Sequence, residues 1–117
     1  MSTTAGARYG DCLSASWLAA RLAVDPAKIE AMRRAGELIA VREPGSAEWR
    51  YPAWQFSEWK PRRVVPRITA VARETGLDET RLYEVLTAPL GLSGRRRLVD
   101  LLLEGRDDDV VEAVRRG

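Results

Sequence analysis

The sequence contains no histidine and a single cysteine, Cys12. Without histidine there is no Ser-His-Asp or Cys-His catalytic arrangement, and no imidazole to bind a metal. One cysteine can form neither an internal disulfide nor a cysteine-based zinc site, and it gives no support for an oxidising, secreted location. These absences argue against an enzyme, and we expect neither a metal nor a cofactor.

Long apolar runs are also missing. No stretch approaches the ~18 apolar residues that span a bilayer, and residues 1–10 have no signal-peptide core. The 117 residues are enough for one domain, and 45% apolar with 31% charged residues is typical of a soluble globular protein. We therefore expect a cytoplasmic protein without a membrane partner.

Lysine is rare: of 19 basic residues, all except Lys28 and Lys60 are arginine. The net charge is only +2, and it divides equally between residues 1–60 and 61–117. The local distribution is less even, because no acid interrupts the bases from Lys60 to Arg73. Arginine suits two-pronged contacts with phosphate, although a codon bias towards arginine explains its excess equally well.

The first third of the sequence predicts two short helices separated by a brief turn, over residues 14–22 and 26–35. Four positions carry capping or stop signals for these helices: Ser14 or Ser16, Asp25, Pro26 and Gly36. Residues 1–12 are small and polar, and they predict a loose tail.

The pattern then changes to that of a β-hairpin. Residues 37–43 alternate and are β-branched, which predicts a strand, and residues 44–46 (Pro-Gly-Ser) predict a turn. Residues 48–51 predict the returning strand, which Pro52 closes. Residues 13–60 are thus expected to form a helix, a turn, a second helix and a hairpin.

The remaining residues, 61–117, predict a helical extension. Helices are expected over residues 66–75, from Asp78 to just before Pro89, and over residues 95–104 and 107–116. The last of these begins with three aspartates and ends with two arginines, as the helix dipole favours. The predicted fold class is mostly α, as an α+β protein.

The first half resembles a known family of DNA-binding proteins. Residues 17–24 (WLAARLAV) and 36–41 (GELIAV) are similar to the MerR/excisionase-type winged helix-turn-helix. In that family a small residue, here Ala19 or Ala20, lies inside the first helix, and a Gly-x-Leu-x-Ala segment leads into the wing. The resemblance covers roughly residues 13–56. It implies a winged helix-turn-helix with a small β-hairpin wing, which binds double-stranded DNA as a sequence-specific transcriptional regulator.

Eight basic residues are the predicted DNA contacts: Lys28, Arg33 and Arg34 on the second helix, Arg42 and Arg50 on the hairpin, and Lys60, Arg62 and Arg63 after it. The second helix of such a motif enters the major groove, so we expect Lys28 and Arg33 to contact bases. The alternative is an ordinary solvated helix face, because Glu30 lies among these bases and repels phosphate.

Five of the eight aromatic residues lie within residues 49–59: Trp49, Tyr51, Trp54, Phe56 and Trp59. They can form a stacking platform for single-stranded nucleic acid. We favour the alternative, in which they wedge the hairpin against the helices as core, and of the five we expect Trp59 to be free.

The second half is similar to another family. Residues 51–56, 86–92 and 101–105 resemble the C-terminal, toxin-binding domain of Xre-type antitoxins, over residues 52–117. Arg97 stands where that pattern has proline. This resemblance implies a different function, that of an antitoxin-like subunit that neutralises a partner toxin.

The extension also carries more apolar residues than a short helical hairpin requires: Leu98, Leu101, Leu102, Val110, Val111 and Val114. Two arrangements explain them. They form a core within the chain, or they form the seam of a homodimer that reads two half-sites of DNA.

Overall fold

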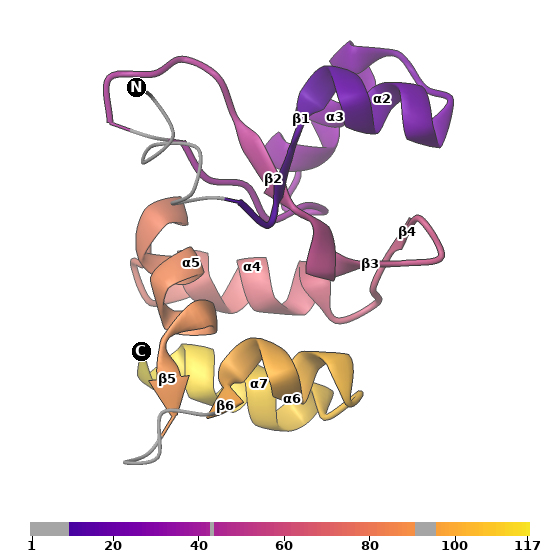
Figure 1. Ribbon diagram of the computed structural model, residues 1–117. Helices are drawn as coiled ribbons and strands as arrows, with labels where there is room; N and C mark the ends of the chain where they lie inside the picture. The colour runs from indigo at the N-terminus through magenta and orange to yellow at the C-terminus, as the bar shows by residue number, and fades with distance from the viewer. Residues whose placement is uncertain (1–9, 43, 91–95) are drawn as a thin grey trace.

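Three small antiparallel strand pairs and a larger number of helices make up an α+β fold, described by a computed structural model for residues 10–42, 44–90 and 96–117 (Figure 1). In chain order the elements are β1 (Cys12–Ser14), α2 (Ala15–Leu22), α3 (Pro26–Arg34), β2 (Arg50–Pro52), the 3-10 helix η1 (Ala53–Gln55), β3 (Phe56–Ser57), β4 (Lys60–Pro61), α4 (Val65–Glu74), α5 (Glu79–Thr87), β5 (Pro89–Leu90), β6 (Arg96–Arg97), α6 (Leu98–Leu103) and α7 (Asp107–Arg116).

The two predicted N-terminal helices are confirmed, together with their end signals. The backbone N–H of Trp17 donates to Ser14 Oγ at 3.1 Å, and that of Ala27 donates to Asp25 Oδ1 at 2.8 Å. Each bond satisfies an N–H that the first turn of a helix leaves unpaired. Gly36 follows α3 with φ = +80°, the left-handed conformation expected of a glycine that ends a helix.

The segment before α2 is more ordered than a loose tail over residues 1–12. Cys12 begins β1, which pairs antiparallel with β2. Asp11 accepts hydrogen bonds from the Tyr83 hydroxyl at 2.6 Å and from Trp54 Nε1 at 2.8 Å. The prediction is therefore wrong for these two residues, because strand pairing and a distant helix hold them. The earlier part of the predicted tail lies outside the described residues.

The predicted strand over residues 37–43 is also wrong. Of the six described residues in this segment, only Val41 pairs, in a single bridge with Arg50 whose two N···O distances are 2.8 and 2.7 Å. The backbone of Ile39 bonds instead to the side chain of Gln55, which accepts from its N–H at 2.6 Å and donates to its C=O at 2.7 Å. A glutamine side chain thus replaces the neighbouring strand.

The predicted hairpin is consequently reduced to a loop closed by that one bridge. The chain turns at Pro44 and Gly45 and returns as β2, and we call the intervening segment, residues 42–49, the wing loop. Glu43 lies outside the described residues.

Three of the four predicted C-terminal helices are confirmed as α4, α5 and α7. The helix expected from residue 95 begins later, at Leu98, because Arg96 and Arg97 extend the chain into β6 and pair with β5. Residues 91–95 lie outside the described part of the chain.

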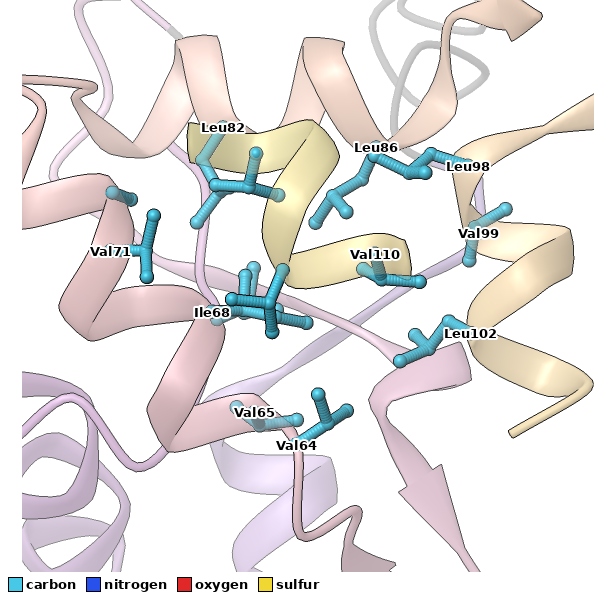
Figure 2. Close-up of a cluster of buried hydrophobic side chains, with 14 residues drawn as sticks. Val64, Val65, Ile68, Val71, Leu82, Leu86, Leu98, Val99, Leu102 and Val110 are labelled. Atoms are coloured by element: carbon cyan, nitrogen blue, oxygen red, sulfur yellow. The ribbon is translucent and has the colours of Figure 1, made fainter. Parts of the chain in front are cut away.

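Two large clusters of buried side chains form most of the core, one in each half, and Val41 and Tyr83 form a small third cluster. The larger lies between α4, α5, α6 and α7, whose apolar side chains converge in Figure 2. The smaller lies between α2, α3 and β2 and includes Leu18, Ile29 and Tyr51. Residues 38–40 join them, since Leu38 and Ala40 belong to the smaller cluster and Ile39 to the larger.

The apolar residues of the extension pack within the chain. Five of the six considered above are buried in the larger cluster and Leu101 packs against it. These residues therefore contribute to the core of the chain itself, as the first of the two arrangements predicts. No helix among the described residues is long and apolar enough to cross a membrane.

Candidate nucleic-acid interface

The wing loop is held against α3 by a tryptophan between two arginines. The Arg33 Cζ lies 4.2 Å from the centroid of the Trp49 ring, and the Arg42 Cζ lies 4.6 Å from it. A guanidinium over an indole face is attracted by the ring quadrupole and also stacks on it. The contact between Arg33 and Trp49 joins α3 to the wing loop without a pair of hydrogen-bonded strands.

The side chain of Arg33, a predicted base contact, is largely buried. Its side chain is only 15% exposed, and its Nη2 donates to Glu30 at 3.2 Å. Its buried Nε has no hydrogen-bond partner in the described structure. Burial raises the pKa of the neighbouring Tyr51 hydroxyl, and the positive charge of Arg33 opposes that shift. Arg33 therefore supports the junction between α3 and the wing loop.

Lys28 and Arg34 are the exposed cations of α3. The Arg34 side chain is 72% exposed and its Nη2 lies 2.7 Å from Glu30, which it shares with Arg33. Exposed pairs of this kind contribute only about 0–1 kcal/mol, so Arg34 can exchange Glu30 for another anion. The Lys28 side chain has neither a hydrogen bond nor an ion pair with the described residues.

The C-terminal end of α3 is fixed by two residues of α4. Arg73 Nη2 donates to the carbonyls of Arg33 at 3.3 Å and Arg34 at 3.1 Å, and Thr69 Oγ1 donates to the carbonyl of Gly36 at 2.5 Å. Last-turn carbonyls have no partner within their own helix, so these bonds complete it. Helical periodicity identified the apolar face of α4 but could not show what its polar residues contact.

The three cations that follow β3 differ in their surroundings. Lys60 and Arg63 are exposed, and their side chains make no ion pair with the described residues. Arg62 is half-buried and its Nε donates to the carbonyl of Trp54 at 3.0 Å. Arg62 thus also stabilises η1, a role that the basic run in the sequence does not reveal.

The predicted packing of the aromatic residues is confirmed for Tyr51 and Phe56, which are buried in the smaller cluster. The expectation that Trp59 stays free is wrong: its ring centroid lies 5.2 Å from that of Trp17 and 6.0 Å from that of Phe56. Trp17 lies on α2, outside residues 49–59, and Phe56 lies within them but is buried. The spacing of the aromatic residues along the chain therefore could not show that Trp59 packs against both.

Ion pairing differs strongly between the two halves. In the described C-terminal half, arginine pairs with a carboxylate in Arg67–Asp108, Arg81–Glu84, Arg96–Glu104, Arg97–Asp100, Arg106–Asp109, Arg115–Glu112 and Arg116–Glu112. In the described N-terminal half, up to residue 63, the cations without a carboxylate partner are Arg21, Lys28, Arg42, Lys60, Arg62 and Arg63. Among the described residues, the part of the chain up to residue 63 thus has six cations without a carboxylate partner, and the part after it has one, Arg73.

Comparison with known proteins extends this description at the level of the fold. No family model matches the sequence, and no curated protein matches it. The chain is similar to a solved structure, the NMR structure of Rv2175c, with a TM-score of 0.76 and 22% sequence identity. The match covers 90% of this chain and 79% of that one, so the similarity includes both halves.

Proposed function

We propose that this protein binds double-stranded DNA in a sequence-specific manner and acts as a transcriptional regulator. In this proposal α2, α3 and the wing loop form a winged helix-turn-helix, with α3 in the major groove. The observation that carries it is the unequal ion pairing. Among the described residues, Lys28 of α3, Arg42 of the wing loop and Lys60 of β4 lack carboxylate partners, whereas most arginines of the C-terminal half are neutralised within the chain.

Each cation of α3 and the wing loop has a role that fits its position. Lys28 lies in the N-terminal half of α3, the part of a recognition helix that reaches base edges. Arg42, whose Cζ stacks on Trp49, and Arg34, which is 72% exposed, suit contacts with phosphates. Arg33 holds the wing loop in place, so its contribution to recognition is the orientation of its neighbours.

Selection of bound duplexes from a random pool tests this proposal. We expect enrichment of a defined motif, and an affinity for that motif that falls with salt at a slope of about 0.9 per neutralised phosphate. Four to six phosphate contacts are expected as a rough estimate from the number of available cations. No binding to any duplex at low salt, or an affinity independent of salt, would rule out DNA binding.

Two substitutions separate base reading from phosphate binding. Lys28→Ala should alter the selected motif and weaken the best site by about 1–3 kcal/mol. Arg63→Ala should weaken all duplexes alike and reduce the salt slope by about one unit. Arg81→Ala is the matched control, since Arg81 lies on α5 and pairs with Glu84 at 3.4 Å. An unchanged motif for Lys28→Ala would show that α3 does not read bases through this residue.

A further inference from the structure

Two tryptophans and an arginine meet on the surface beside α2. The Trp17 and Trp59 ring centroids are 5.2 Å apart, and the Arg21 Cζ lies 5.0 Å from the Trp59 ring and 5.9 Å from the Trp17 ring. Trp17 is 47% exposed, which is unusual for the largest apolar side chain. Tryptophan and arginine are also the residue types enriched where binding energy concentrates.

The tight turn that carries Trp59 is held in a strained conformation. Glu58 and Trp59 connect β3 to β4 and have φ angles of +52° and +59°. Such a two-residue turn favours Asn-Gly, because a side chain in the left-handed region crowds the backbone. Strained positions of this kind persist where the surrounding structure holds them, and they concentrate at functional sites.

Arg21, the cation of this cluster, is available for an anion, whereas Lys60, which follows Trp59 in the chain, lines a separate hollow with Arg62, Arg63 and Asp107. Neither Arg21 nor Lys60 pairs with a carboxylate among the described residues. A guanidinium held by aromatic rings still has N–H groups that can make a two-pronged contact with phosphate. Glu58 is the acid of the turn, and it is exposed.

We infer that Arg21, held in place by Trp17 and Trp59, forms a second phosphate-binding element for the same DNA duplex. This inference rests on the proposed function and extends it. Two observations support DNA as the occupant: α2 packs directly on α3, and the β3–β4 hairpin lies on the other side of β2 from the wing loop (Figure 1). The element would therefore contact backbone that flanks the bases read by α3.

Fluorescence anisotropy with the selected duplex tests the inference, using one duplex trimmed to the motif and one with long flanks. Arg21→Ala should weaken binding to the long duplex about tenfold and lower its salt slope by about 0.9, as expected for one lost phosphate contact. The loss should be much smaller on the trimmed duplex. Arg81→Ala, which removes a paired arginine of α5, should change neither affinity.

A second variant guards against loss of the fold. The substitution Arg21→Gln removes the positive charge but leaves both rings and their packing in place. We expect a melting temperature close to that of the parent, together with weaker binding to the long duplex.

The outcomes separate the two proposals. Parent-like affinity and salt slope for both variants would overturn the second element while leaving DNA binding intact. If the parent self-associates in sedimentation and the variants do not, with DNA binding unchanged, the cluster is assigned to a contact between copies of this chain, which would also overturn the second element. Failure of the parent to bind any duplex would instead remove the proposed function on which the element depends.

Discussion

Gln55 shows how one buried side chain can decide the path of the backbone. It is fully buried, its Oε1 accepts from the Ile39 N–H, and its Nε2 donates to the carbonyls of Ile39 and Pro52 at 2.7 and 3.1 Å. Buried backbone groups without partners are costly, so these bonds allow an extended segment to cross the core without a strand beside it.

We expect Gln55→Leu to destabilise the protein by about 1–3 kcal/mol for each of the two Ile39 backbone groups that it leaves unpaired. Denaturant unfolding followed by tryptophan fluorescence measures this loss. Gln55→Glu is the matched control, because it keeps the shape and the acceptor but loses the donor. A Gln55→Leu variant as stable as the parent would show that these bonds contribute little.

Cys12 is protected from ionisation by its surroundings. Burial above all, and then the negative charge of Asp11, raise the pKa of the Cys12 thiol from 9.0 to about 12. Burial and a hydrogen bond to Asp11 also raise the pKa of Tyr83. The neutral thiol is thus the form that the folded protein favours over a wide range of pH.

Two consequences can be measured. Iodoacetamide should label Cys12 much more slowly in the folded than in the unfolded protein at pH 8, because the thiolate is the reactive form. Folding stability should fall as the pH rises from about 9 to about 12, since over this range the unfolded thiol ionises and the folded one does not. Labelling at equal rates in both states would contradict the raised pKa.

At the scale of elements, α4 links the two halves and positions α3. Thr69 and Arg73 bind the carbonyls at the end of α3, and an added Cβ at Gly36 would lie 3.0 Å from Thr69 Oγ1 and 3.1 Å from Arg73 Nη1. The close approach and the positive φ both require glycine at residue 36. The orientation of α3 therefore depends on a helix that contributes no cation to the proposed DNA surface.

We expect Arg73→Ala to weaken binding to the selected duplex by about 0.5–2 kcal/mol while leaving binding to random duplex nearly unchanged, because it loosens α3 without removing a phosphate contact. Anisotropy titrations on both duplexes, at a temperature well below unfolding, measure the ratio. Arg73→Lys should recover part of the discrimination. Equal weakening on both duplexes would indicate a direct phosphate contact by Arg73 instead.

At the scale of the whole molecule, the two halves are one folding unit. Ile39, from the N-terminal half, is buried in the cluster that α4, α5, α6 and α7 enclose. Leu38 and Ala40, its neighbours, are buried in the other cluster. The segment that leads from α3 to the wing loop thus lies between two cores and is stabilised by both.

Truncation after Gly76 should therefore abolish cooperative unfolding, because it removes α5, α6 and α7 and exposes Ile39, Ile68 and their neighbours. Thermal unfolding followed by circular dichroism tests this. A truncated chain that melts in one sharp transition would show that the N-terminal half folds alone.

Much of the local structure could be predicted from the sequence, because it depends on residues close together in the chain. Ser14 and Asp25 cap α2 and α3, Gly36 ends α3, and the acids and bases at the ends of α7 match its dipole. The apolar spacing also identified the buried faces of these helices. Such signals act within one or two turns, so a sequence contains them whatever the rest of the fold.

Only the tertiary structure decided which contacts join distant residues. The alternation of residues 37–43 predicts a strand equally well whether its second face meets solvent or a second core, and here both faces of residues 38–41 are buried. Likewise, Arg33 and Arg67 are both arginines on helices. One stacks on Trp49 and the other pairs with Asp108, 41 residues along the chain. Side-chain charge is a property of the sequence, but its neutralisation depends on which chain segments meet in space, and that is decided by packing.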